Sequence, residues 1–183
     1  MNRRQRLRRT RIRNACLIGP LALALVLWLI GLLLPIRHAE EVHTFLGASA
    51  ETVWAVLNDL DGMPNWRHDI RGLERLPDLL GQARWLEVGS GGRRTTYQRV
   101  ESVTPRRLVV RSSAPNRQWV YEIRALDRGS ELAVREERTI SHPLMRALVL
   151  IFGADRGRIE GLTSDLDRRL AGRLAQLAAR PVD

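Results

Sequence analysis

The chain has 183 residues, of which 30 are basic and 20 are acidic, and every basic residue is an arginine. Seven arginines lie between Arg3 and Arg13, whereas the residues from Arg37 onward carry 23 arginines and 20 acidic residues, a net charge of +3. The excess charge lies in the tail, which argues against nucleic-acid binding by the rest of the chain, since that needs a concentrated basic face. The single cysteine, Cys16, excludes an intrachain disulfide.

An uncharged stretch from Ala15 to Leu34 follows the basic tail. Twenty helical residues extend about 30 Å, the thickness of the hydrocarbon core of a bilayer. The sequence therefore predicts a transmembrane helix over residues 15–36. Arginines are costly to translocate, so we expect the tail of residues 1–14 to stay in the cytoplasm. The rest of the chain is then expected on the periplasmic side of a bacterial inner membrane.

A cleavable signal peptide is the competing interpretation, because it also combines a basic start with an apolar stretch. Its cleavage site needs small residues, and the candidate site here reads Arg37-His38-Ala39. A twin-arginine export signal at Arg8-Arg9 is a further alternative, which the residues after that pair match poorly. These observations favour an uncleaved anchor, a linker over residues 37–41, a folded domain over 42–179 and a short tail over 180–183.

The folded domain begins with a predicted strand and two predicted helices. Residues 42–48 have the composition of a strand. Ser49 offers an N-cap oxygen to the first helix, Gly62 follows its end, and Pro64 suits the first turn of the second, short helix. The apolar stripe of the first helix consists of Val53, Val56, Leu57 and Leu60.

Six short segments with β-branched and alternating residues come next, and turn residues such as Pro77-Asp78 separate them. Successive strands joined by turns indicate an antiparallel meander. Residues 143–179 return to helical spacing and predict one long helix, with Gly153 and Gly157 as places where it can kink. This helix is long enough to cover the apolar face of the sheet, which gives an α+β fold. The six segments are 71–76, 83–88, 95–103, 107–112, 118–126 and 131–140.

This pattern resembles the START/Bet v 1-like superfamily, which includes the SRPBCC and polyketide cyclase/dehydrase proteins. The resemblance covers about residues 41–179 and implies a helix-grip fold, with a seven-stranded antiparallel sheet wrapped around the C-terminal helix. It also implies a cavity that holds a lipid, sterol or polyketide in many members. The family has no universal catalytic residue, so the fold assigns no reaction. The matching motifs are Ala48 to Trp54, Leu57-Asn58-Asp59, Met63 to Trp66, Val103 to Leu108, Trp119-Val120-Tyr121 and Gly129 to Leu132.

Aromatic residues are the candidate lining of such a cavity. Alternation places Trp119, Tyr121 and Ile123 on one face of their predicted strand, which we expect to face inward. Aromatic walls with a few polar tips suit an apolar ligand that has one polar end, although the same rings can simply fill a core. The full predicted lining is Trp66, Trp85, Tyr97, Trp119, Tyr121, Ile123 and Phe152.

Glu136 is the one candidate catalytic residue. It shares the parity of Leu132 and Val134, so it is expected to face inward, where a carboxylate needs a partner. It is either a general acid or base, as in cyclising relatives, or a member of a structural ion pair near the sheet rim. No metal or other cofactor is expected, because the four histidines show no metal-ligand spacing. These histidines are His38, His43, His68 and His142.

Three functions follow from this pattern. The first is a membrane-anchored binding or carrier module whose cavity takes an apolar small molecule or lipid. The second is an enzyme, a cyclase or dehydratase that acts on a polyketide-like substrate. The third is a protein-interaction module of an envelope complex. The sequence does not discriminate the identity of the ligand.

Overall fold

The computed structural model describes residues 19–113, 116–152 and 156–178 of the chain. Contacts divide the chain into two units, Met1–His38 with Ile140–Ala154 and Ala39–Thr139 with Asp155–Asp183. The predicted basic tail, Cys16 and the C-terminal tail lie outside the described residues.

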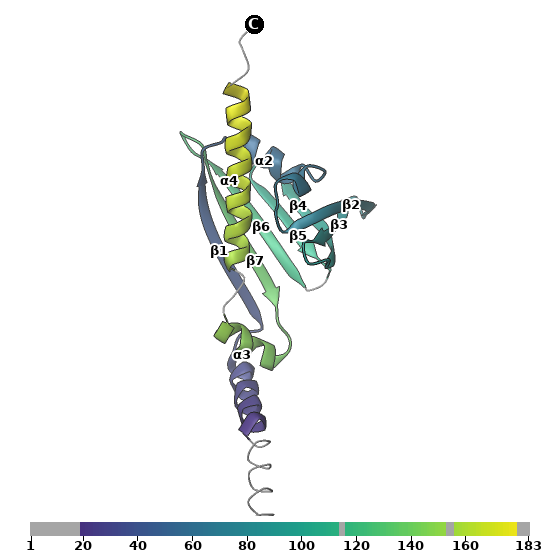
Figure 1. Ribbon diagram of the computed structural model, residues 1–183, viewed down its shortest axis with the longest axis vertical. Coiled ribbons are helices and arrows are strands. Elements are labelled where there is room, and N and C mark those ends of the chain that lie inside the picture. The colour runs from purple at the N-terminus through teal and green to yellow at the C-terminus, as the bar shows by residue number, and fades with distance from the viewer. Residues whose placement is uncertain (1–18, 114–115, 153–155, 179–183) are drawn as a thin grey trace, which may run out of the picture. The chain divides into compact units, whose positions relative to one another are not determined.

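The second unit is built on one seven-stranded antiparallel sheet, which confirms the predicted sheet (Figure 1). Its strand order is β1-β7-β6-β5-β4-β3-β2, so each strand from β2 to β7 pairs with the next along the chain. This order follows from the short turns between the strands, because a short connection joins antiparallel neighbours. The strands are β1 (Arg37–Leu46), β2 (Ile70–Leu79), β3 (Gln82–Gly89), β4 (Arg94–Val103), β5 (Arg107–Ser112), β6 (Arg117–Ala125) and β7 (Ser130–Thr139).

Two helices and one 3₁₀ turn complete this unit: α2 (Ala50–Asn58), η1 (Met63–Asn65) and α4 (Arg156–Ala178). The side chain of Ser49 caps α2 by accepting a hydrogen bond from the backbone N–H of Thr52 at 3.3 Å. Figure 1 shows α4 running along one face of the sheet. The core lies between that face and the helices, where Leu46, Val53, Val134 and Leu166 are fully buried.

The hairpin between β2 and β3 turns three residues later than predicted. Strand β2 continues through Pro77 with a register irregularity between Leu76 and Leu79. A proline is tolerated there because β2 is an edge strand, where an N–H can be missing without breaking a ladder. The turn itself uses Leu80 and Gly81, both with positive φ (54° and 74°), as a two-residue hairpin turn requires.

Strand β1 starts earlier than predicted, because residues 37–41, expected as a linker, form its first half. Its burial alternates along the strand, which is the pattern of a strand with one face on a core. At its other end, Leu46 lies close to Gly129, where a Cβ would stand 2.2 Å from the Leu46 carbonyl oxygen. Gly129 also has a φ of 85°, so the β6–β7 turn requires a glycine there.

The predicted single C-terminal helix is two helices, α3 (Pro143–Phe152) and α4. Gly153 and Gly157 lower the helix propensity around this break. The apolar side chains of α4 are buried over its first part, at Ile159, Leu166 and Leu170, whereas Leu174 near its end is 42% exposed. Only the helix after the break belongs to the unit that holds the sheet.

The first unit holds α3 and a helical segment over residues 19–33. This segment is the described part of the predicted transmembrane helix, whose first residues, 15–18, lie outside the described chain. Within the described ranges, no helix is both long and apolar enough to cross a membrane.

Candidate functional site

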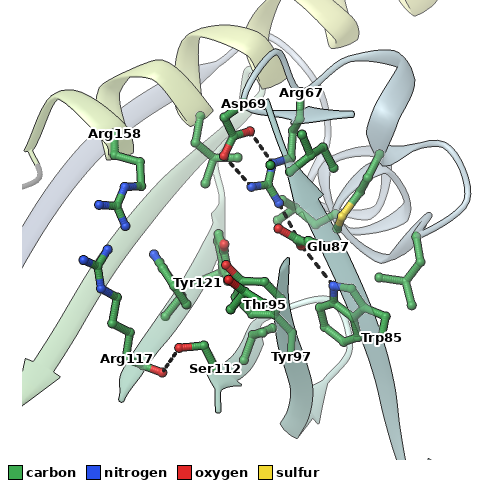
Figure 2. Close-up of a pocket in the computed structure, with 18 of the residues that line it drawn as sticks. Arg67, Asp69, Trp85, Glu87, Thr95, Tyr97, Ser112, Arg117, Tyr121 and Arg158 are labelled. Atoms are coloured by element: carbon green, nitrogen blue, oxygen red, sulfur yellow. Dashed lines mark hydrogen bonds and ion pairs between the residues drawn. The ribbon is translucent and has the colours of Figure 1, made fainter. Parts of the chain in front are cut away.

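A cavity of about 290 Å³ opens between the inner face of the sheet and α4 (Figure 2). Ile123, which was predicted to line the cavity, is buried in the core and does not line it. The side chain of Phe152 lies outside what the structure describes. The structure places five predicted residues on the wall: Trp66, Trp85, Tyr97, Trp119 and Tyr121.

Neighbouring strands bring three of these rings together. Trp85 on β3 lies directly opposite Tyr97 on β4, and their rings stack with centroids 5.9 Å apart and an interplanar angle of 18°. Tyr97 also contacts Trp119 on β6, with centroids 5.5 Å apart and a tilt of 52°. Stacked and tilted pairs of this kind stabilise a fixed arrangement of rings. The wall is therefore a connected aromatic surface.

Three charged side chains, Arg67, Asp69 and Glu87, lie beside this surface, and together with the indole of Trp85 we call them the Glu87 cluster (Figure 2). Arg67 donates to both oxygens of Asp69, from Nε at 2.9 Å and from Nη2 at 2.7 Å. Its Nη1 donates to Glu87 Oε1 at 3.1 Å, and the same oxygen accepts from Trp85 Nε1 at 3.0 Å. The cluster holds an indole and a guanidinium in fixed positions on the cavity wall.

Burial and charge act in opposite directions in this cluster. The side chains of Arg67 and Glu87 are only 14% and 5% exposed. Burial alone would lower the pKa of Arg67, but the charges of Glu87 and Asp69 outweigh it and raise the pKa above its ordinary value. Burial likewise opposes ionisation of Asp69, and its hydrogen bonds from Arg67 lower its pKa nonetheless. Arg67 and Asp69 therefore stay ionised at neutral pH.

Two tyrosines of the wall are neutral. Burial raises the pKa of Tyr97 and of Tyr121, and the negative charge of Glu87 adds to this effect while Arg67 opposes it. A neutral phenol keeps its proton and can donate a hydrogen bond to an oxygen of a bound molecule. The aromatic wall thus has polar tips, which Figure 2 shows beside the Glu87 cluster.

A second group of charges, the Glu136 cluster, consists of Glu136, Arg117 and Arg158. Glu136 on β7 has a side chain only 4% exposed, and its Oε1 lies 3.1 Å from Arg117 Nη1 and 3.7 Å from Arg158 Nη1. Both arginines line the cavity, and Figure 2 shows them reaching toward each other from β6 and α4. Glu136 is thus buried, as its position in the strand alternation predicts. It also forms ion pairs, as the interpretation as a structural ion pair requires.

Trp66 adds a buried donor to the wall. Trp66 is 9% exposed, and its indole Nε1 has no hydrogen-bond partner within the described part of the chain. A buried donor without a partner costs free energy, which an acceptor oxygen on a ligand would recover. The hydroxyl-bearing residues Thr95 and Ser112 also line the cavity.

His68 takes no part in the cavity lining. Its ring Nδ1 contacts a carboxylate oxygen of Asp165 on α4, and its backbone N–H donates to the same oxygen at 3.0 Å. The adjacent Asp69 pairs with Arg67 instead. Among the described residues, no three histidine, cysteine or acidic side chains are placed to hold a metal ion.

Sequence reasoning missed the charged residues of the wall, although one pattern could have found Glu87. Trp85 and Glu87 are two residues apart on β3, so alternation puts them on the same face, as it did for Glu136 and Val134. Arg67 and Asp69 lie between η1 and β2, where no periodicity applies. Arg117 and Arg158 meet only because β6 and α4 come together.

Comparison with known proteins identifies this architecture. The sequence matches the family described as polyketide cyclase / dehydrase and lipid transport over residues 46–156, more than half of the chain. No curated protein matches it.

Solved structures show the same fold. The di-domain ARO/CYC StfQ from the steffimycin biosynthetic pathway has a TM-score of 0.63 and 12% identity over 76% of this chain and 53% of that chain, so the present chain spans about half of its length. The Zhui aromatase/cyclase from Streptomyces sp. R1128 has a TM-score of 0.61 and 16% identity over 75% and 96%. A START superfamily protein from Mycobacterium smegmatis has a TM-score of 0.55 and 17% identity over 74% and 97%. At these identities the similarity shows the fold alone.

Proposed function

The chain belongs to the polyketide cyclase / dehydrase and lipid transport family, and we propose that its sheet domain binds an apolar molecule that has one polar end. The observation that carries this proposal is that the cavity wall combines apolar aromatic surface with polar and charged groups. Trp66, Trp85 and Trp119 supply apolar surface, while the Glu87 cluster and two neutral phenols supply polar groups in the same space. A cavity of about 290 Å³ is at the lower end of the range for small-molecule sites, which suits a compact ligand.

The polar end of the ligand is expected to carry acceptor oxygens. The wall offers donors, namely Trp66 Nε1, which has no partner among the residues that the structure describes, and the protonated phenols of Tyr97 and Tyr121. Five arginines also line the cavity, against two acidic residues, so an anionic or carbonyl group is favoured over a cation. The lining arginines are Arg67, Arg93, Arg99, Arg117 and Arg158.

Native mass spectrometry of the purified full chain tests this proposal. We expect a bound small molecule that survives purification and is lost from Ser112→Trp, because Ser112 is buried on the cavity wall and an indole there fills the space. Ser113→Trp is the matched control, since Ser113 is the next residue, is exposed and does not line the cavity. Thermal melts of both variants check that they fold. A folded Ser112→Trp protein that keeps the adduct would overturn the proposal.

A cyclase or dehydratase is the second candidate function. The named activities of the aromatase/cyclase structures belong to those proteins, but the neutral phenols of Tyr97 and Tyr121 give this chain its own proton donors inside the cavity. Incubation with a poly-β-keto thioester, followed by absorbance of an aromatic product, measures such a reaction. Tyr97→Phe and Tyr121→Phe are expected to slow it, and Glu136→Gln tests the predicted acid or base. Equal turnover in all three variants and the parent would remove this candidate.

Membrane attachment is the second part of the proposal. The support is the uncharged sequence from Ala15 to Leu34, the seven arginines before it and the helical conformation of residues 19–33. With this orientation the basic tail is cytoplasmic and the sheet domain is on the periplasmic side of the inner membrane. An alkaline carbonate wash of isolated membranes is expected to leave the full-length protein in the pellet. Release into the supernatant, or a mature N-terminus beyond residue 39, would contradict an uncleaved anchor.

A further inference from the structure

Helix α3 is almost free of polar side chains. Its sequence, PLMRALVLIF, contains one charged residue, Arg146, and nine apolar ones. Met145, Leu150 and Ile151 are nevertheless 50%, 63% and 57% exposed. An apolar helix with such an outer surface is unusual for a protein segment in contact with water.

The guanidinium of Arg146 is buried within the first unit. Its Nη1 donates to the backbone carbonyl of Leu34 at 2.8 Å, and Arg146 is only 6% exposed. Leu34 directly follows the helical segment 19–33, where carbonyl groups lack helical partners and a cation is favourable. The only charge of α3 is therefore turned inward, against the end of the neighbouring helix.

Close packing fixes α3 to that same helix. A Cβ on Gly31 would lie 1.9 Å from the carbonyl oxygen of Pro143, so the two backbones meet where only a glycine fits. The backbone N–H of Ile140 also donates to the carbonyl of Ile36 at 2.8 Å. The helical segment itself exposes apolar side chains, such as Leu29 at 49% and Leu32 at 47%. Both helices of this unit thus present charge-free outer surfaces.

We propose that α3 is a second membrane-contacting element, which lies in the bilayer interface with Met145, Leu150 and Ile151 against the acyl chains. Ten helical residues extend about 15 Å, half of a hydrocarbon core, so α3 is too short to span a bilayer and long enough to lie in its surface layer. The proposal rests on the proposed N-terminal anchor, to which α3 is attached. Burying the guanidinium of Arg146 against Leu34 is what suits this surface to hydrocarbon rather than to water or to a charged partner.

Depth-dependent quenching in liposomes tests this placement with the full chain. Cys16 is the only cysteine, so Cys16→Ser allows single labels to be introduced. Leu150→Cys and Ile151→Cys carry an NBD fluorophore on α3, and Leu25→Cys reports the N-terminal segment. Asp127→Cys, in the exposed turn between β6 and β7, is the control on the sheet domain. Lipids with a nitroxide on the acyl chain are then added to the bilayer.

The four labels distinguish α3 from the anchor. We expect NBD at positions 25, 150 and 151 to lose most of its emission with nitroxide lipid, and NBD at position 127 to keep it. Quenching at 25 without quenching at 150 and 151 would overturn the placement of α3 and leave the anchor intact. No quenching at any position would overturn both. Blue-shifted but unquenched emission on α3 would show that protein, such as a second copy of the chain, covers this surface, which also overturns the proposal.

Discussion

The Glu87 and Glu136 clusters place a buried carboxylate at two positions on the same face of the sheet, but they join different parts of the fold. Glu87 connects β3 to the segment between η1 and β2 through Arg67. Glu136 connects β7 to β6 through Arg117 and to α4 through Arg158. Glu87 and Glu136 are therefore buried to the same extent but have different structural roles. The Glu87 cluster shapes the cavity wall, and the Glu136 cluster fastens the helix over it.

Removing the guanidinium of the Glu87 cluster is expected to have the largest effect on stability. Arg67→Met leaves Glu87 and Asp69 without their cation, and breaking a buried pair in this way costs about 3–5 kcal/mol. Urea denaturation measures the change in the free energy of unfolding. Arg75→Met is the matched control, because Arg75 also binds both oxygens of an aspartate, Asp61, but at the surface.

In the control, we expect little or no loss of stability, as for other exposed ion pairs. Similar losses in Arg67→Met and Arg75→Met would contradict the importance of burial in the Glu87 cluster.

A smaller loss is expected at the Glu136 cluster. Glu136→Gln keeps the shape of the side chain but removes its charge, and we expect about 1–3 kcal/mol because Arg117 is 13% exposed while Arg158 is 40% exposed and reaches water. Hydrogen exchange should show faster opening in α4 than in β3. Glu122→Gln, which weakens an exposed pair with Arg107, serves as the control. Faster exchange confined to β3 would show that Glu136 does not fasten α4.

The indole hydrogen bond of the Glu87 cluster is a finer test. Trp85→Phe removes the donor to Glu87 Oε1 while keeping an aromatic ring against Tyr97, and the hydrogen-bond contribution is about 1.5–3 kcal/mol at most because the acceptor is charged. Comparing Trp85→Phe with and without Arg67→Met forms a double-mutant cycle. The coupling energy is expected to differ from zero, since both donors share one oxygen. Strict additivity would show that the two bonds are independent.

At alkaline pH the two tyrosines of the cavity wall are expected to lose part of their contribution to stability, whereas at neutral pH this contribution is complete. The pKa values of Tyr97 and Tyr121 are raised in the folded state, so their contribution to stability is complete below the unfolded pKa of about 10. It is lost as the pH rises above that value, because the unfolded state then releases protons more readily. The double variant Tyr97→Phe/Tyr121→Phe should flatten this alkaline decline. An unchanged decline would assign it to other groups.

Hydrophobic periodicity was sufficient to predict the seven-stranded sheet and the capped helix α2. Alternation and turn residues define strands such as β5, predicted over 107–112 and found at Arg107–Ser112. Alternation also predicted the inward faces of Trp119 and Tyr121, which lie on the cavity wall, because it decides which face of a strand a side chain occupies. These features depend on local sequence, which is why they could be predicted.

The rest depends on contacts between distant segments. Pro77 was predicted to lie in a turn. A strand accepts a proline when it is an edge strand, and only the order of the strands in the sheet shows that β2 is one. The division into α3 and α4 was predicted only as a kink at Gly153 or Gly157, because both segments have helical spacing, and the close approach of Pro143 to Gly31 could not be predicted from local sequence. Arg67 and Asp69 belong to an irregular connection, so no period marks them.

The indoles on the cavity wall also allow ligand binding to be followed by the intrinsic tryptophan fluorescence of the protein. Three of the five tryptophans, Trp66, Trp85 and Trp119, line the cavity, and each is less than 10% exposed. Indole emission responds to the polarity of its surroundings, so any compound that enters displaces solvent next to most of the emitting groups at once. Libraries of unlabelled compounds can therefore be screened by following the emission of the unmodified chain.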